Sequence, residues 1–366
     1  MDKRLEVIDA LRGFALLGII IVNVRFFNEA FAVISLGGLP AEGRVNTTIE
    51  VLISIFFEGK FILLFSFLFG LGTWFIYIGA SREGASFASR YFKRIAFLWI
   101  IGIFHGTFIW YGDILSIYAM VGLILLCLVK RSSSVIFTFA IISTLLIPVI
   151  LLVFDGSGYS NELTIETDTL ISYQEDSAAA YRDGTFSEQQ LQRLNDYIGS
   201  LLTMVLFVPQ ILGMFLLGLY VGKRQQGIFT NKKTMKKLAV FGMGLGLPIQ
   251  VINVIYDHQL LQSVAHFIAA PILMFGYVGC FCLLYRVFPI RGLVAVGRMG
   301  FTNYLMQSLL LATLFYGFSL FGEMVTWQTF VISLTVFIVQ FLYSSVYMSR
   351  FRTGPLESVW RSVYKR

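Results

Sequence analysis

Long apolar runs follow one another along almost the whole chain, and they constrain the fold more than any other feature. A membrane-spanning helix needs about 20 mostly apolar residues. Ten runs of this kind occur, at 7–27, 60–80, 92–110, 112–130, 134–154, 199–222, 237–256, 262–285, 295–320 and 326–349. The sequence therefore predicts an all-α, polytopic transmembrane helix bundle with about ten spanning helices. The shorter run 46–58 predicts an interfacial helix before the second span.

The composition excludes most classes of soluble protein. Of the 366 residues, 57% are hydrophobic and 13% are charged, and the mean hydropathy is +0.77. A soluble domain is roughly 45–50% apolar and about 25% charged. These values exclude a disordered chain, a nucleic-acid-binding module and an ordinary soluble enzyme. We expect a single integral membrane domain over 1–366, with membrane lipids as its neighbours and no nucleic-acid partner.

The distribution of charge predicts the orientation. Lysine and arginine gather in every second connection between the runs and at both ends of the chain. Basic connections stay in the cytoplasm, so we expect both termini to be cytoplasmic. The longest connection on the other side, 155–198, has nine acidic residues against Arg182 and Arg193. It is expected to be an extracytoplasmic acidic loop between spans five and six, with short amphipathic helices near 186–198.

Polar residues inside two of the runs are the first functional candidates, because an ionisable group in a membrane is costly. In the first run, Asp9, Arg12 and Asn23 fall within about 60° of each other on a helix. In the third run, His105 follows Arg94 by eleven residues, on the same face and about 16 Å further along. Packed together, the two faces would form a polar slot. Alternatively, Asp9 and Arg12 pair at the membrane interface and Asn23 bonds a neighbouring helix.

A carboxylate follows His105 across a short turn. Asp113 opens the fourth run, so the two side chains should lie at a similar depth on neighbouring antiparallel helices. A carboxylate that orients an imidazole is the usual support for a general base. Alternatively, Asp113 only caps its helix and His105 is a hydrogen-bonded core residue. Glu58 and Lys60 are expected at the same outer level, as part of the site or as a salt bridge at its rim.

The ninth run adds a third arginine. Arg298 lies near the cytoplasmic end and could join Arg12 and Arg94 around an anion. Asn303 and Gln307 could bind substrate or only bond neighbouring helices. The sequence has no cluster of histidine, cysteine, aspartate and glutamate with metal-ligand spacing, so we predict no metal.

Five stretches of the chain together resemble a known family. They are IDALRGFALLGIIIVN at 8–23, GKFILLFSFLFGLG at 59–72, RIAFLWIIGIFHGTFIWYGDILSIYAMVG at 94–122, GRMGFTNYLMQSLLLATLFYG at 297–317 and GPLESVWR at 354–361. They resemble the YeiB-like family, catalogued as domain of unknown function 418, and the resemblance covers almost everything except 155–198. It implies membership of a superfamily of transmembrane acyltransferases that includes heparan-α-glucosaminide N-acetyltransferase. It also implies a multi-pass protein of the bacterial plasma membrane.

The resemblance implies a reaction as well. An acyl group would pass from cytoplasmic acyl-CoA to a hydroxyl or amine of a glycan, lipid or small metabolite, across or within the membrane. The superfamily pattern Asp-x-x-Arg-Gly followed by Asn is present as Asp9, Arg12, Gly13 and Asn23. The lysosomal enzyme has a catalytic histidine shortly after that asparagine, whereas residues 24–45 contain none here. His105 is the intramembrane histidine placed to substitute for it.

Each candidate therefore has an expected role. We expect His105, oriented by Asp113, to take the acceptor's proton and Asn23 to donate to the developing oxyanion. The expected acyl-CoA-binding residues are Asp9, Arg12, Arg94 and Arg298, and the expected acceptor-binding residues are Glu58, Lys60, Asn303 and Gln307. The expected partners are acyl-CoA, an acceptor molecule and a second copy of the chain in a homodimer. The alternative functions are a transporter or lipid flippase using the same slot, and a receptor or scaffold.

Overall fold

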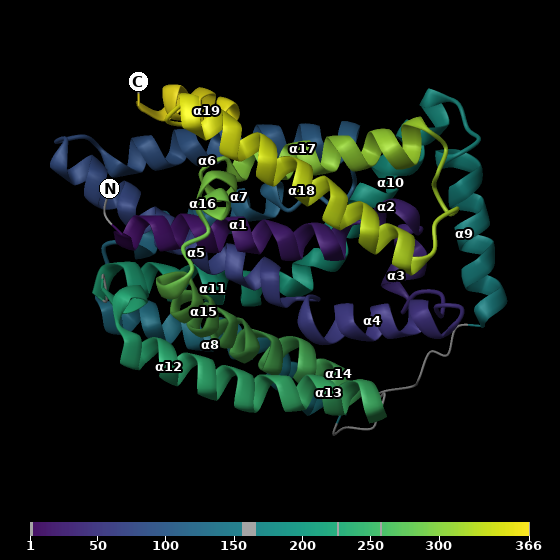
Figure 1. The fold of residues 1–366 in the computed structure, drawn as a ribbon, viewed down its shortest axis with the longest axis horizontal. Helices are drawn as coiled ribbons and strands as arrows, with labels where there is room; N and C mark the ends of the chain where they lie inside the picture. The colour runs from purple at the N-terminus through teal and green to yellow at the C-terminus, as the bar shows by residue number, and fades with distance from the viewer. Residues whose placement is uncertain (1–2, 156–165, 225–226, 257, 366) are drawn as a thin grey trace.

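The structure, a computed structural model, describes residues 3–155, 166–224, 227–256 and 258–365. All regular structure in these ranges is helical. The long helices run side by side along one direction (Figure 1). A helix satisfies its backbone hydrogen bonds internally, which is what a bilayer requires of a spanning segment. The predicted all-α, polytopic bundle is confirmed.

The first half of the chain contains α1 (Lys3–Asn23), α2 (Arg25–Asn28), α3 (Phe31–Ser35), α4 (Arg44–Phe56), α5 (Lys60–Arg82), α6 (Phe87–Phe104), the π-helix η1 (His105–Ile109), α7 (Leu115–Leu128) and α8 (Ser133–Asp155). The middle contains α9 (Thr167–Tyr181), α10 (Phe186–Met204), the 3₁₀ turn η2 (Val205–Phe207), α11 (Val208–Arg224), the 3₁₀ turn η3 (Ile228–Thr230), α12 (Lys232–Phe241), the π-helix η4 (Gly242–Gly246) and α13 (Leu247–Tyr256). The last part contains α14 (Gln259–Val264), the π-helix η5 (Ala265–Ala269), α15 (Ala270–Val287), α16 (Arg291–Arg298), α17 (Gly300–Ala312), the π-helix η6 (Thr313–Gly317), α18 (Thr326–Arg350) and α19 (Pro355–Lys365).

Eight helical stretches of the described chain are long and apolar enough to cross a membrane. They are Glu6–Asn28, Arg44–Arg82, Phe87–Ile109, Ser133–Val153, Phe186–Arg224, Lys232–Tyr256, Leu260–Val287 and Thr326–Arg350. The other two predicted spans are also helical. The run 112–130 forms the shorter α7, and the run 295–320 is divided into α16 and α17 by a break at Met299.

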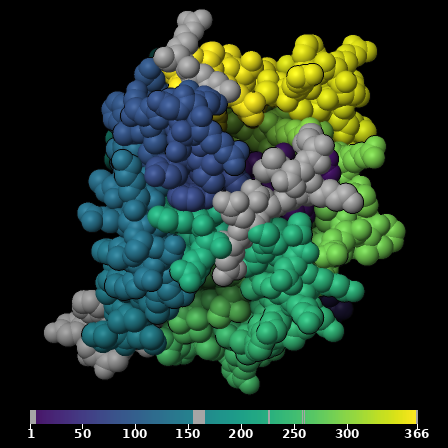
Figure 2. All heavy atoms as spheres, turned by 90° about the vertical axis from the view of Figure 1, so that its left-hand side faces the viewer, coloured from purple at the N-terminus to yellow at the C-terminus, as the bar shows by residue number. Residues whose placement is uncertain are grey.

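Both chain termini lie at one end of the bundle, which we call the terminal end (Figure 1). Figure 2 looks onto this end, where the last helical segment runs along one edge. α9 lies across the opposite end (Figure 1). The segment 155–198 is more helical than expected, because it contains α9 and most of α10. α10 begins with a capping box in which Thr185 and Glu188 bond each other's backbone N–H groups.

The segment predicted as an interfacial helix forms α4, which runs roughly parallel to the long helices rather than across the end of the bundle (Figure 1). A turn at Phe57–Gly59 joins it to α5. Gly59 has a φ of +77°, a conformation that glycine adopts without strain. α4 and α5 therefore form one long helical stretch, Arg44–Arg82, and the polar and charged residues in the first half of α4 lie at its start.

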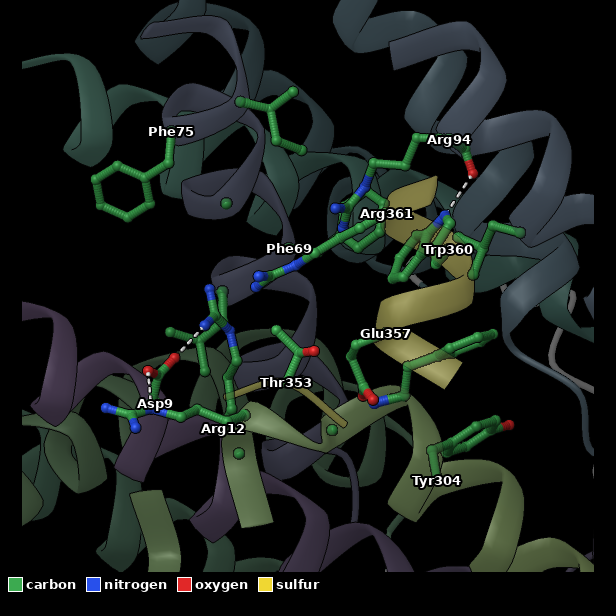
Figure 3. A pocket seen from close by; sticks show the side chains of 18 of the residues that line it. Asp9, Arg12, Phe69, Phe75, Arg94, Tyr304, Thr353, Glu357, Trp360 and Arg361 are labelled. Carbon is green, nitrogen blue, oxygen red and sulfur yellow. Dashed lines mark hydrogen bonds and ion pairs between the residues drawn. The ribbon is translucent and has the colours of Figure 1, made fainter. Parts of the chain in front are cut away.

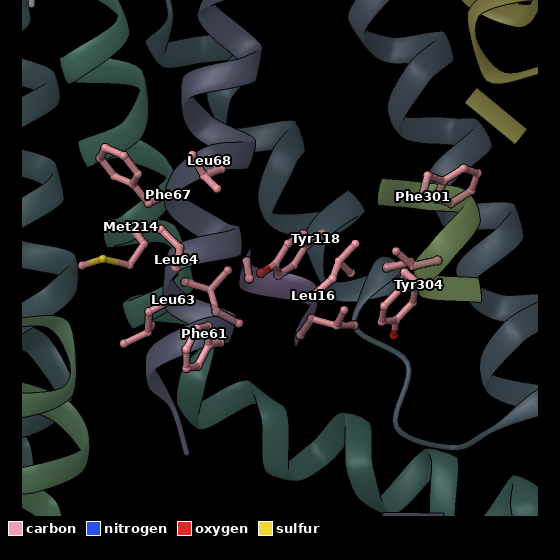
Figure 4. Close-up of a cluster of buried hydrophobic side chains, with 14 of the residues drawn as sticks. Leu16, Phe61, Leu63, Leu64, Phe67, Leu68, Tyr118, Met214, Phe301 and Tyr304 are labelled. Atoms are coloured by element: carbon pink, nitrogen blue, oxygen red, sulfur yellow. The ribbon is translucent and has the colours of Figure 1, made fainter. Parts of the chain in front are cut away.

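Aromatic and aliphatic side chains fill the centre of the bundle. Leu16 of α1 and Tyr118 of α7 lie between the apolar side chains of α5 and the Phe301–Tyr304 turn of α17 (Figure 4). The hydroxyl groups of Tyr118 and Ser66 are 2.6 Å apart, so the phenol is hydrogen-bonded although it is buried. This packing fixes α17 relative to α1 and α7.

α1 and α16 approach each other more closely than any side chain would allow. A Cβ atom on Gly297 would lie 1.8 Å from the Asp9 carbonyl oxygen, and one on Gly13 would lie 2.2 Å from the Leu293 carbonyl oxygen. Only glycine fits at such contacts. The close approach places the α16 residue that follows Gly297, namely Arg298, beside Asp9.

The Gly297→Ala variant should be less stable because its methyl group must push α16 away from α1. Overpacking of this kind costs about 1–3 kcal/mol, so thermal unfolding in detergent should occur at a lower temperature. Gly79→Ala on α5 is the matched control, because a Cβ there meets nothing within 4 Å. Equal melting temperatures for both variants and the wild type would contradict the close approach.

Candidate active site

A cavity of about 790 Å³ opens at the terminal end, within the range of about 300–1,000 Å³ that small-molecule sites occupy. Its walls come from α1, α5, α6, α7, α16, α17, α18 and α19. Its charged lining residues are Asp9, Arg12, Arg94, Arg298, Arg352, Glu357 and Arg361. In the part of the chain that the structure describes, five guanidinium groups face two carboxylates, which makes the cavity suited to an anion. Asp9 and Arg12 lie on one side and Arg94, Trp360 and Arg361 on the other (Figure 3).

One carboxylate is shared between two of the arginines. Asp9 accepts a hydrogen bond from Arg12 Nη1 at 2.6 Å and another from Arg298 Nε at 3.3 Å. The predicted pairing of Asp9 with Arg12 is therefore present, but the carboxylate balances only one of the two positive charges. The group keeps a net positive charge at the cavity wall.

Arg94 is held by aromatic faces. Its guanidinium carbon lies 4.0 Å from the ring centroid of Trp360 and 5.6 Å from that of Phe69, which is the geometry of cation–π contacts. Trp360 Nε1 donates to the Arg94 carbonyl oxygen at 3.1 Å, so α19 is also tied to α6. Within the described residues, the buried Arg94 Nε has no hydrogen-bond acceptor. No carboxylate of the described residues forms an ion pair with Arg94, so the aromatic faces position its positive charge.

The C-terminal helix forms a wall that was not among the sequence candidates. The Glu357 carboxylate accepts hydrogen bonds from the backbone N–H groups of Phe301 and Thr302, at 2.7 and 3.0 Å, and from the Thr302 hydroxyl at 2.6 Å. It therefore caps the beginning of α17, where the helix dipole favours a negative charge. The sequence does carry a signal for this helix, because residues 356, 357, 360 and 364 are spaced to fall on one helical face.

The cavity extends inward to Tyr304, and His105 packs against this side chain. The ring centroids of Tyr304 and His105 are 5.4 Å apart. His105 Nδ1 lies 3.0 Å from Asp113 Oδ1, and both side chains are 0% exposed. Asp113 also accepts hydrogen bonds from the backbone N–H groups of Leu115 at 3.1 Å and Ser116 at 2.8 Å. Asp113 therefore has both of the roles that the sequence left open, since it contacts His105 and caps α7.

These contacts determine which nitrogen of His105 can act as a base. An ionised carboxylate only accepts hydrogen bonds, so Nδ1 carries the imidazole proton and Nε2 carries the lone pair. Nε2 is buried and has no hydrogen-bond partner in the part of the chain that the structure describes. Buried polar atoms are almost always bonded. An unbonded, oriented Nε2 is what a general base needs before its substrate arrives.

α10 holds the segment that carries His105. Arg193 Nη1 donates to the Phe108 carbonyl oxygen at 3.1 Å. The hydroxyl groups of Tyr197 and Ser116 lie 2.9 Å apart. The predicted acidic loop thus contributes a helix that fixes η1 and the start of α7. A π-helix at this point fits the frequent occurrence of such segments at functional sites.

Asn23 ends α1, is half-buried and is not a lining residue of the cavity. The segment that follows it contacts the turn after η1. The Tyr111 hydroxyl donates to the Phe26 carbonyl oxygen at 2.8 Å, and the Phe27 ring stacks on Trp110 with centroids 4.4 Å apart. The structure therefore brings the end of α1 to the segment around His105, and the oxyanion role of Asn23 stays a prediction.

The predicted acceptor residues Glu58 and Lys60 lie elsewhere. Lys60 is buried and donates to the Ser54 carbonyl oxygen at 2.6 Å and to Gln250 Oε1 at 3.0 Å. Glu58 is exposed, and the described residues show no ion pair between it and Lys60. Lys60 thus ties α5 to the end of α4 and to α13, outside the arginine-lined cavity.

Asn303 and Gln307 bond neighbouring helices. Asn303 Nδ2 donates to the Val296 carbonyl oxygen at 3.1 Å and to Ser344 Oγ at 3.0 Å. Gln307 Nε2 donates to Gln340 Oε1 at 2.9 Å. These contacts match the alternative in which the two amides join helices, here α17 with α16 and α18.

Replacing Asn303 by alanine should lower stability and leave ligand affinity in the cavity unchanged. An interhelical hydrogen bond in a membrane contributes about 0.6 kcal/mol, so losing two should lower the melting temperature modestly. Scanning fluorimetry and calorimetry with acyl-CoA measure the two quantities on one preparation. An unchanged melting temperature with weakened ligand binding would instead assign Asn303 to the ligand.

Comparison with known proteins places the chain in a family. The profile of a family described as "Protein of unknown function (DUF418)" matches residues 224–366. The chain is 32% identical to "Uncharacterized protein YxaH" of Bacillus subtilis (strain 168), and the match covers 99% of this chain and 94% of that protein. The chain belongs to the YeiB-like (DUF418) family. It is also 26% identical to "Uncharacterized protein YeiB" of Escherichia coli (strain K12), over 100% of this chain and 97% of YeiB. No solved structure matches the chain.

The part that matches the DUF418 profile contains only some of the site. Arg298, Tyr304 and Glu357 lie inside it, whereas Arg12 and His105 come from the preceding part of the chain. The YxaH and YeiB relatives match over nearly the full length, so their similarity to this chain extends over both parts. A comparison of this site among members of the YeiB-like family therefore needs their full-length sequences.

Proposed function

We propose that this protein is a membrane-embedded acyltransferase that uses cytoplasmic acyl-CoA. One observation carries the proposal: a cavity lined by five arginines extends to Tyr304, and His105 packs against that residue with an Nε2 that has no hydrogen-bond partner among the described residues. This arrangement joins a site for a polyanionic donor to a general base. The proposal includes the relation to the transmembrane acyltransferase superfamily. It also includes a location in the bacterial plasma membrane, for which the apolar helices and the bacterial relatives are the support.

The cavity wall suits the two chemically different parts of acyl-CoA. Arg12, Arg94 and Arg298 would hold the CoA phosphates by charge-assisted hydrogen bonds, which are stronger than hydrogen bonds between neutral groups. Deeper in the cavity the lining is largely aromatic and aliphatic, including Leu98 and Tyr118. The pantetheine arm would lie along this surface, with its thioester toward Tyr304.

His105 would act on the acceptor. Its Nε2 takes the proton from the acceptor hydroxyl or amine, whose oxygen or nitrogen attacks the thioester carbon. This attack forms the new bond and gives a tetrahedral intermediate in which the former carbonyl oxygen is an oxyanion. Its collapse breaks the C–S bond and leaves the ester or amide, and the sulfur leaves as the CoA thiolate, which receives the proton from His105. Asp113 keeps Nδ1 protonated and stabilises the imidazolium. Asn23 would donate to the oxyanion of the intermediate.

The decisive test is acyl-CoA binding together with CoA release. The purified protein in detergent is titrated with acetyl-CoA and longer acyl-CoAs by calorimetry, and free thiol is then measured after addition of a membrane extract as acceptor source. Saturable binding and acceptor-dependent thiol release are expected. A protein that neither binds acyl-CoA nor releases CoA is not an acyltransferase.

A transporter or flippase is the second candidate, favoured by the His105–Asp113 pair inside the bundle. A buried histidine and carboxylate in hydrogen-bond contact can also relay protons along a permeation path. Substrate flux in proteoliposomes without acyl-CoA consumption would support this function.

A further inference from the structure

We propose that a second cavity at the terminal end binds a phosphate ester, the group carried by phospholipid headgroups and by small soluble phosphates. The cavity has a volume of about 870 Å³ and lies among α1, α15, α16, α18 and η3. The acyl-transfer proposal does not use it, and the inference does not rest on that proposal.

The charge of this second cavity favours an anion. Among the described residues, Arg286, Arg291 and Arg298 line it against a single carboxylate, Glu6. Arg286 Nη1 donates to the Thr230 carbonyl oxygen at 2.8 Å, which ties the end of α15 to η3 and fixes one side of the opening. Three guanidinium groups around one opening match a phosphate better than a carboxylate, because phosphate offers more acceptor oxygens.

Apolar side chains make up a large part of the remaining lining, and they narrow the class of ligand. Val7, Phe229, Cys282 and Met348 contribute to the wall, and all but Met348 are buried or nearly so in the bundle. A polar phosphate beside an apolar wall is the chemistry of a phospholipid headgroup with the start of its acyl chains. Basic pockets between transmembrane helices on the cytoplasmic side bind anionic lipid headgroups in this way.

The two cavities are distinct but share two lining residues, Arg298 and Met348. Arg298 lines both, whereas Asp9, which accepts its hydrogen bond, lines only the first. Arg286 and Arg291 line only the second, and Arg361 lines only the first. Variants of these unshared arginines can therefore assign any phosphate binding to one cavity.

The experiment is a titration of the full-length protein in a neutral detergent with short-chain phosphatidylglycerol, short-chain phosphatidylcholine or sn-glycerol 3-phosphate. The melting temperature is measured by scanning fluorimetry at each concentration. We expect a saturable rise with phosphatidylglycerol and a much smaller one with phosphatidylcholine, because the arginines repel the choline cation that accompanies its phosphate. In Arg291→Gln the apparent dissociation constant should rise roughly tenfold or more, because a charge-assisted bond is lost. Arg291 is exposed, so its replacement should not impair folding, and Arg286→Gln is the second variant.

Two further variants make the result specific. Lys236→Gln, an exposed residue of α12 that lines neither cavity, should behave like the wild type. Arg361→Gln should also leave the lipid effect unchanged. A rise with phosphatidylglycerol alone identifies a lipid site, and an equal rise with glycerol 3-phosphate identifies a site for soluble phosphate esters. The proposal is overturned if neither compound stabilises the protein, if Arg291→Gln and Arg286→Gln both titrate like the wild type, or if only Arg361→Gln weakens the effect.

Discussion

The His105→Gln variant should transfer acyl groups roughly 10²–10⁴ times more slowly than the wild type, the contribution typical of a general base. Glutamine can still donate a hydrogen bond to Asp113, so the pair that joins η1 to α7 is retained in part. The side chain has no lone-pair nitrogen to take a proton. The measurement is thiol release from acyl-CoA in the presence of a membrane extract.

Acyl-CoA binding and melting temperature serve as the controls for this variant, because His105 lies behind Tyr304 and not among the lining residues of the cavity. Both should match the wild type. A companion variant, Asp113→Asn, keeps a similar shape but removes the carboxylate that selects the tautomer, so its rate should fall as well. Equal turnover by His105→Gln and the wild type would remove His105 from the role of base.

Arg12→Gln should weaken acyl-CoA binding by about 1.5–3 kcal/mol, or roughly 10–150-fold, because a hydrogen bond between charged partners contributes that much. Arg12 lies on α1 and bonds Asp9, and its loss leaves Asp9 to neutralise Arg298 alone. The positive charge of the cavity therefore falls by one. Calorimetry with acetyl-CoA at low and high salt measures the change.

Arg131→Gln is the matched control for this prediction. Arg131 is exposed and lines neither cavity, so its loss removes the same charge without touching either site. Its acyl-CoA affinity should equal that of the wild type. Equal weakening in both variants would mean that net charge alone attracts the ligand, and unchanged affinity in Arg12→Gln would exclude the arginine cavity as the donor site.

Two parts of the site could be predicted from the sequence. One follows from the depth of residues along the apolar runs, and the other from a short connection between two runs. Arg12, Arg94 and Arg298 each lie near the same end of an apolar run, so packing the runs brings them to one level. The turn between His105 and Asp113 is too short for the two residues to lie far apart. The depth of the three arginines and the short turn between His105 and Asp113 therefore allow both groupings to be predicted without knowledge of the helix packing.

Other features depend on packing between distant segments. Lys60 bonds Gln250, which is 190 residues away, and no local pattern identifies such a partner. The break at Met299 lies inside a continuous apolar run, so hydropathy gives no sign of it. α19 is short and amphipathic, and it becomes a wall of the cavity only through contacts with α6 and α17.

The arginine-lined cavity is a composite of segments that lie far apart in the chain, since α1, α5, α6 and α7 precede residue 224 and α16 to α19 follow it. Neither part contains all five arginines that line the cavity. A gene fragment encoding only 224–366 would therefore encode the cap Glu357 and the residue Tyr304 without His105, the proposed base. Surveys of genomes for the proposed activity should require equivalents of Asp9, Arg12 and His105 in addition to a match to residues 224–366. Two separately expressed halves should regain the cavity only when they assemble in one membrane.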